Sequence, residues 1–194
     1  MEIGATKAVQ DRLKTTKIEE SKGASLVFCW DTHLTKIKGR NVLFIVNASN
    51  RYTIAMTDIE PRNWNYYTMY IRSVIHGVIQ EMGYSEDQIG QYFKMSGDTT
   101  VTKTHGRKSV GGINRMVMDA QYFGKKLEKE AKYQWELSEY LNRDICQPEG
   151  FDAYGYPSEL FKLDMERLGI AAKRKPAKVI DFSQYIESNR GTND

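Results

Sequence analysis

The chain has 194 residues, of which 40% are hydrophobic and 27% charged, with a formal net charge of +3. This balance excludes a disordered polyelectrolyte and a histone-like polycation, and it indicates one globular domain with extensions or two very small ones. Two cysteines, Cys29 and Cys146, are too few for a disulfide framework. The polar N-terminus and the lack of long apolar runs predict a soluble, cytoplasmic protein without a membrane partner.

The first half of the chain predicts a short helix followed by strands. Ala8, Val9 and Leu13 stand at helical spacing. A continuous apolar run, NVLFIVN, is typical of a buried strand, and the alternating run after it completes a β-hairpin. The expected elements are a helix over 5–15, strands over 25–30, 41–47 and 51–57, and a turn over 48–50.

The second half predicts mainly helices. Aromatic and aliphatic residues from Trp64 to Met82 share one helical face, which Gly83 terminates. Ser85 is typical of the N-cap of a following short helix, and Pro157 of the first turn of a last one. The expected elements are helices over 64–82, 85–96, 114–143 and 157–170, and a strand over 99–104.

Together these elements predict an α+β fold, with a small antiparallel sheet packed with an amphipathic helix layer and a helical C-terminal extension. We expect the α+β domain to span residues 1–123 and the helical extension to span 124–180. The polar tail at 181–194 is typical of disorder.

The histidines and cysteines do not predict a catalytic or metal site. Cys29 and His33 are the only pair with strand spacing that suits a metal, and two ligands do not make a zinc site. A nucleophilic arrangement of Cys29, Asp31 and His33 is discounted because three neighbours on one strand are not expected to point the same way. His76 lies between core positions of a helix. We therefore expect no metal, no cofactor and no catalytic residues.

Residues 101–116, VTKTHGRKSVGGINRM, form the most distinctive stretch, with four basic side chains and no Asp or Glu. Gly106 and Gly111 have the separation of a phosphate loop, but Gly112 and Ile113 stand where that motif needs Lys and Ser or Thr. What remains is a strand, a basic flexible turn and a helix start that favours anions. A solvated turn is the alternative reading. The candidate anion-binding residues are Lys103, His105, Arg107, Lys108 and Arg115.

A second basic cluster lies near the C-terminus, at Lys173, Arg174 and Lys175. If both clusters lay on one face, they would form an electrostatic footprint for a polyanion. A solvated tail explains the second cluster equally well.

Several of these motifs together resemble an uncharacterised family of small bacterial and mobile-element proteins. The family pattern is a T-K-x-L helix, W-H-x-N-L, a V-L-F-x-N strand and a closing K-T-x-N-R-S-V-L-G-S-M-N-D. The corresponding segments here are TKAVQDRLK, the stretch from Trp30 to Leu34, NVLFIVNASNRYTI and the stretch from Lys103 to Arg115. The resemblance covers about residues 4–123 and implies a fold, without an activity.

Three departures from that pattern concern charge. Lys108 stands where the family has Ser, and Arg115 stands where it has Asp, so this stretch is more basic than the pattern. Asp31 stands where the family has His. An anionic partner is therefore expected to be specific to this protein.

These observations favour a non-catalytic binding protein that meets nucleic acid or an acidic protein surface through the basic stretch. The family's occurrence in mobile elements makes a phage-encoded inhibitor of a host defence nuclease, such as a CRISPR nuclease, a specific form of that hypothesis. Two alternatives stay open. One is an enzyme that acts on a nucleotide or other phosphorylated ligand, and the other is an antitoxin-like protein-interaction module that docks through the helix at 64–82. The sequence leaves the oligomeric state undetermined.

Overall fold

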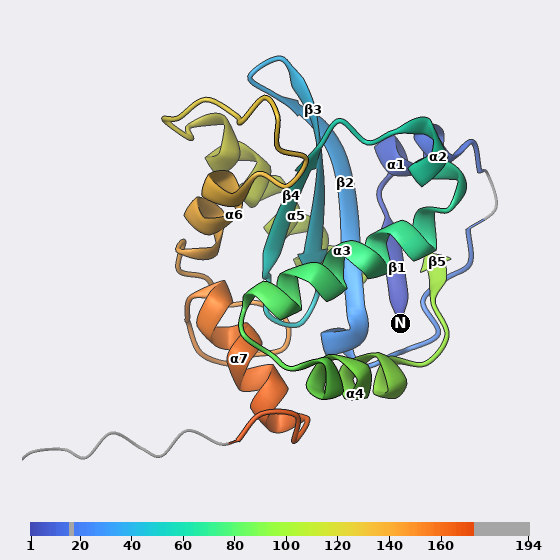
Figure 1. Cartoon of the computed structure of the whole chain (residues 1–194), viewed down its shortest axis with the longest axis vertical. Coiled ribbons are helices and arrows are strands. Elements are labelled where there is room, and N and C mark those ends of the chain that lie inside the picture. Colours follow the sequence, from blue (N-terminus) through green and yellow to red (C-terminus); the bar gives the residue numbers. More distant parts are fainter. Residues whose placement is uncertain (16–17, 173–194) are drawn as a thin grey trace, which may run out of the picture.

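The fold is seen in a computed structural model of the chain, which describes residues 1–15 and 18–172 (Figure 1). Strands and helices alternate irregularly along these residues, and a short 3₁₀ turn at Leu26–Phe28 leads into the second strand. The elements are β1 (Glu2–Ala5), α1 (Lys7–Leu13), β2 (Cys29–Ile37), β3 (Arg40–Asn47), β4 (Thr53–Thr57), α2 (Pro61–Asn65), α3 (Tyr67–Glu81), α4 (Glu86–Ser96), β5 (Thr100–Thr102), α5 (Gly106–Gln121), α6 (Trp135–Asn142) and α7 (Pro157–Arg167).

The strands form one mixed sheet in the order β4-β3-β2-β1-β5. The α+β class is confirmed, and β2, β3 and β4 pair antiparallel as expected. The sheet is not wholly antiparallel, because β1 runs parallel to both of its neighbours, β2 and β5. The sequence analysis missed β1, since Glu2 and Gly4 interrupt the apolar pattern that marks a buried strand.

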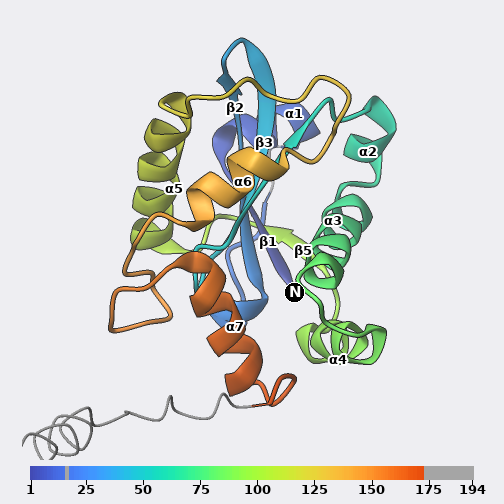
Figure 2. The same cartoon turned by 60° about the vertical axis from the view of Figure 1, so that its left-hand side comes forward.

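Helices cover both faces of the sheet rather than one (Figure 2). Alternate strand residues point to opposite faces. Leu43 and Ile45 pack into the larger core with α3, α4 and α7, and Val42 and Phe44 pack into a second core with α5 and α6. The single helix layer of the prediction is therefore two layers, which Figure 2 shows on either side of the strands.

Two hairpins join β2, β3 and β4, and turn chemistry explains the first of them. The β3–β4 hairpin is confirmed, with residues 41–47 in β3 and its partner strand following the turn. β2 extends past the predicted residue 30 to Ile37, and Lys38 and Gly39 both have positive φ between β2 and β3. Two consecutive positive φ values are typical of the two-residue turn that matches the twist of paired strands.

Two predicted helix ends are confirmed, the end of the amphipathic helix before Gly83 and the start of the next helix at Ser85. The long amphipathic helix is split into α2 and α3, and Gly83 follows with φ +90°. Ser85 caps α4 through a capping box, in which its side chain accepts from the Gln88 amide and the Gln88 side chain accepts from the Ser85 amide.

The helix predicted over 114–143, with Gly124 as a point where it could break or bend, is interrupted by a long non-helical segment. α5 begins earlier, at Gly106, and ends at Gln121, while α6 begins only at Trp135. The connecting residues follow the second core, where Phe123 and Leu127 are buried. Charged side chains of this segment form ion pairs across the fold, as Lys125–Glu136 and Lys132–Glu60.

α6 and the segment before it cover the open edge of β4. The Asn142 side chain accepts from the Thr53 amide and donates to the Thr53 carbonyl, both at 2.8 Å. Ser138 Oγ accepts from the Ala55 amide at 3.0 Å, and the Thr57 amide donates to the Lys132 carbonyl at 2.8 Å. An edge strand with free backbone groups can pair with another chain and aggregate. The contacts from Asn142, Ser138 and Lys132 satisfy these groups of β4 within the protein.

We predict that Asn142→Ala lowers the free energy of unfolding by about 3 kcal/mol, because it leaves the N–H and C=O groups of Thr53 buried without partners. Urea unfolding measures this loss. Arg143→Ala, one residue further on, removes only an exposed ion pair with Glu139 and should cost less than about 0.5 kcal/mol. Equal losses in the two variants would show that the edge contact does not stabilise the fold.

Candidate functional site

The candidate site begins with the register of β1 and β2. Glu2 pairs with Cys29 and Gly4 pairs with Asp31. Residues two apart on a strand point to the same face, so Glu2, Cys29 and Asp31 all point toward the face that α5 covers. The expectation that Cys29, Asp31 and His33 would not all point the same way is wrong for this reason, because they stand two apart on β2.

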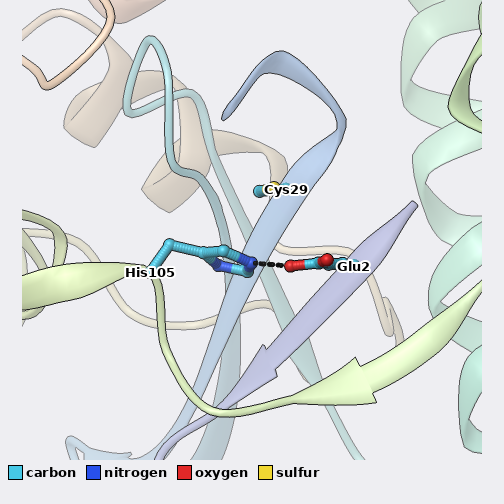
Figure 3. Close-up of side chains that lie close together, drawn as sticks. All are labelled: Glu2, Cys29 and His105. Atoms are coloured by element: carbon cyan, nitrogen blue, oxygen red, sulfur yellow. Dashed lines mark hydrogen bonds and ion pairs between the residues drawn. The ribbon is translucent and has the colours of Figure 1, made fainter. Parts of the chain in front are cut away.

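His105 completes the cluster from the start of α5 (Figure 3). Its Nδ1 lies 2.7 Å from Asp31 Oδ1, and its Nε2 lies 3.0 Å from Glu2 Oε2. The three side chains are almost completely buried, with exposed fractions of 3% for His105, 0% for Asp31 and 6% for Glu2. A single imidazole therefore bridges two buried carboxylates.

The electrostatics of the cluster favour a charged imidazole. Burial alone would lower the pKa of His105, but its hydrogen bond to Asp31, with a smaller effect of Cys29, outweighs burial and raises the pKa to about 10. Burial raises the pKa of Glu2, but hydrogen bonds from Ser21, the Lys22 amide and His105 hold it below its usual value overall. The carboxylates and the imidazolium thus stabilise one another away from water.

Asp31 also occupies the N-terminus of α5. Its carboxylate accepts from the His105 amide, at 3.2 Å, and from the Ser109 hydroxyl. The start of a helix carries partial positive charge and free amides. The sequence analysis expected this helix start to attract an external anion, and the anion found there is the protein's own Asp31.

The backbone around Asp31 leaves no room for a further atom. A Cβ on Gly4 would lie 1.8 Å from Asp31 Oδ1 and 3.0 Å from the Thr104 Cα. Residues 21–25 cover the other side of the cluster, where the Lys22 amide donates to Glu2 at 2.8 Å and the Cys29 thiol approaches the Ser25 carbonyl at 3.5 Å. The cluster is enclosed by two strands, one helix start and this segment.

The basic stretch is not a flexible turn. α5 begins at Gly106, and Ser109, Ile113, Met116 and Ala120 are buried along one side of it. Gly111 and Gly112 lie within the helix. Gly112 lets the Arg51 side chain approach, since an added Cβ would lie 3.1 Å from Arg51 Nε, and Arg51 donates to the Gly112 carbonyl at 2.9 Å. Core contacts on one face thus outweigh the low helix propensity of two glycines.

The five predicted anion-binding residues separate into two groups. His105 points inward and is buried, so the structure does not place it among the exposed basic groups. The other four residues, Lys103, Arg107, Lys108 and Arg115, are exposed. Lys103 pairs with Glu20, and Arg115 pairs with Asp119. Lys108 Nζ donates to the Pro148 carbonyl. The second basic cluster, Lys173, Arg174 and Lys175, and the predicted tail lie outside the described residues.

The side chains able to bind a metal differ from those considered in the sequence. Glu2, Cys29 and His105 place ligand atoms within 4.8 Å of one another, and all three residues are buried. His33 does not join them, because its Nδ1 lies 3.2 Å from the Thr6 hydroxyl. Sequence reasoning missed Glu2 and Asp31 as site residues, although the two-residue spacing of Cys29 and Asp31 on a strand was a usable signal.

Fold and site together define an α+β domain with a mixed sheet and a buried carboxylate–histidine cluster at the start of α5. The chain belongs to the family described as a domain of unknown function, DUF6933, whose model matches residues 2–160. That match extends beyond the motifs at 4–123 to include α6 and the first turn of α7. No curated protein and no solved structure matches the chain.

Among the described helices, none has the length and apolar character needed to cross a bilayer.

We predict that Gly4→Ala lowers the free energy of unfolding by about 3 kcal/mol, because the new methyl group displaces Asp31 from His105 and from α5. Gly90→Ala is the matched control. Gly90 lies within α4, where an added Cβ meets nothing within 4 Å, so the same change should stabilise the protein by up to about 1 kcal/mol. Chemical denaturation compares the two, and similar effects would contradict the tight packing at Gly4.

A second prediction concerns pH, in buffer with EDTA so that protons are the only cations at the cluster. The raised pKa of His105 makes its stabilisation complete below about 6.5, the unfolded pKa. That stabilisation falls as pH rises toward 10, by about 1 kcal/mol per pH unit. NMR of the imidazole should find His105 protonated at pH 8 and His33, whose pKa burial lowers, neutral. Titration of His105 near pH 6.5 would contradict the cluster.

Proposed function

We propose that the protein is a non-catalytic binding protein that engages a polyanion, with nucleic acid as the leading candidate, through the exposed face of α5. The observation that carries the proposal is the composition of that face. From Thr99 to Met118 the chain has no Asp or Glu, while three basic residues of α5 are exposed. They are Arg107, Lys108 and Arg115.

Helical spacing supports a continuous contact surface. Residues three and four apart lie next to each other on a helix, so the exposed residues of α5 follow one stripe from its first turn to its end. Gly111 in the middle of the stripe is exposed and has nothing near its missing side chain, which lets a partner backbone approach closely. The exposed residues of the stripe are Arg107, Lys108, Gly111, Asn114, Arg115, Met118 and, just past the helix, Tyr122.

The charges of the stripe are available for a partner. The Arg107 side chain has no hydrogen bond or ion pair with any residue in 1–15 or 18–172, and Lys108 Nζ donates to a neutral carbonyl. Arg115 pairs with Asp119 across one helical turn, at 69% side-chain exposure, where solvent weakens the attraction. Lys and Arg side chains of this kind neutralise phosphates and release counterions.

The buried cluster supports a binding role over a catalytic one. A general acid or base must reach its substrate within hydrogen-bond distance or through one water. His105, Glu2 and Asp31 are enclosed, and Asp31 fills the helix start that a phosphorylated substrate would use. These contacts weigh against the alternative of an enzyme that binds a nucleotide at the basic stretch.

A protein partner with an acidic surface is the second candidate, and the C-terminal end of the stripe favours it. Met118 is 60% exposed and Tyr122 is 79% exposed, and both residue types are enriched at protein interfaces. An inhibitor of a host defence nuclease, encoded by a phage, is the specific form of this candidate, since inhibition needs a complementary surface and no active site.

The test is fluorescence anisotropy of the full chain with duplex and single-stranded DNA over a salt series. Affinity should fall steeply between about 50 and 200 mM salt. The double variant Arg107→Glu/Lys108→Glu should bind more than tenfold more weakly and show a salt slope reduced by about 2.

Lys94→Glu is the matched control, because Lys94 is exposed on α4, which packs on the opposite face of the sheet. It should bind as the wild type does. If the wild type does not bind DNA at low salt, or if both variants weaken binding equally, the nucleic-acid proposal is wrong. A pull-down from host cells, repeated after nuclease treatment, then tests the protein candidate, which requires a partner that persists with wild type and is lost with the double variant.

A further inference from the structure

Cys29 belongs to the buried cluster but takes no part in the contacts between the imidazole and the two carboxylates. Cys29 points to the same side of β2 as Asp31, and its sulfur lies within 4.8 Å of a ring nitrogen of His105 and of a carboxylate oxygen of Glu2. In Figure 3 the thiol, the imidazole and the Glu2 carboxylate approach one another from β2, from the start of α5 and from β1. Three segments far apart in the sequence thus bring three different ligand types to one point.

We propose that Glu2, Cys29 and His105 bind one divalent transition metal ion of the zinc class, and that Asp31 positions His105 for it. The proposal is independent of the binding function assigned to α5. Thiolate sulfur, imidazole nitrogen and carboxylate oxygen are the three donors that zinc takes from proteins.

The spacing of the three donors suits such an ion. Zinc lies about 2.3 Å from sulfur and about 2.0–2.2 Å from nitrogen and oxygen, which puts tetrahedral ligands about 3.5 Å from one another. The donor atoms here already lie within 4.8 Å of one another. Side-chain movements on the order of 1 Å would bring the outer donors to that spacing and separate His105 Nε2 from Glu2 Oε2, which lie 3.0 Å apart.

Asp31 supplies the orientation that a metal-bound histidine needs. Metal-ligating histidines usually donate their other ring N–H to a carboxylate or carbonyl, which fixes the tautomer. Asp31 Oδ1 lies 2.7 Å from His105 Nδ1, so the ring presents Nε2 toward Glu2. The carboxylate is itself held by the His105 amide and the Ser109 hydroxyl.

Binding of the ion leaves the net charge of the cluster unchanged. With an imidazolium and a neutral thiol, Glu2, Asp31, His105 and Cys29 carry a total charge of −1. A divalent ion displaces one proton from His105 Nε2 and one from Cys29 Sγ, and the total charge stays the same. The ion therefore exchanges for two protons without adding net charge to a buried region, where unbalanced charge is costly.

The surrounding segments give the ion a route and a free coordination position. Residues 21–25 cover the cluster and are mostly exposed themselves, with Gly23 at φ +81°. A local opening of this segment admits an ion without disrupting the sheet. Three protein ligands leave the fourth position of a tetrahedral site to a water molecule.

The test uses the full chain, stripped of metal under reducing conditions and titrated with Co²⁺ as a spectroscopic substitute for zinc. The wild type should bind one equivalent and show a thiolate-to-cobalt charge-transfer band, with intense visible bands typical of tetrahedral geometry. Zn²⁺ should displace the cobalt and raise the thermal midpoint by several degrees. Absence of the charge-transfer band in the wild type would overturn the proposal without any variant.

Cys146→Ser is the matched control, because Cys146 is the other buried free cysteine and lies away from the cluster. It should retain the cobalt spectrum. Cys29→Ser should keep the far-UV circular dichroism of the wild type and lose the charge-transfer band, and Asp31→Asn should bind about 10–100-fold more weakly. An unchanged band in Cys29→Ser, or its loss in Cys146→Ser, would overturn the assignment.

Discussion

The contact between Asp31 and His105 is the interaction on which the rest of the structure depends. It joins the centre of the sheet to the start of α5, and Glu2 extends it to β1, which pairs with both β2 and β5. Buried charges are costly unless each is paired and hydrogen-bonded. Here the two carboxylates, the imidazole, a backbone amide and a hydroxyl satisfy one another, so the position of α5 is specified by polar contacts as well as by packing.

This constraint also determines what the surface can present. Because Asp31 occupies the helix start and His105 turns inward, the charged side chains that the first turn of α5 exposes to solvent are Arg107 and Lys108. The buried side of the helix fits the second core, and the opposite side is the basic stripe. On the other edge of that core, α6 covers β4 through Asn142 and Ser138. The internal cluster at the start of α5 and the exposed stripe along it therefore depend on the same helix.

Sequence predicted the features that depend on local chemistry. The α+β class, the β3–β4 hairpin and the N-cap at Ser85 follow from apolar period, turn residues and cap residues, and the structure confirms them. β1 and the course of the chain after Gln121 could not be predicted in this way, because long-range pairing with β2 and packing of Phe123 determine them. Of the cluster residues, the sequence considers Cys29 and Asp31 but discounts them. It predicts His105 as an anion-binding residue, whereas His105 is buried between two carboxylates. Its partners Glu2 and Asp31 meet it only through the register of parallel strands, which a single sequence does not show.

The central claim is that Asp31 and His105 stabilise each other in the folded protein. A double-mutant cycle with Asp31→Asn and His105→Gln, followed by urea unfolding at pH 7 with EDTA present, measures their coupling directly. The account predicts a coupling energy of about 2 kcal/mol or more, since either single change leaves a buried charge without its partner. A coupling below about 0.5 kcal/mol, the level of independent sites, would contradict it.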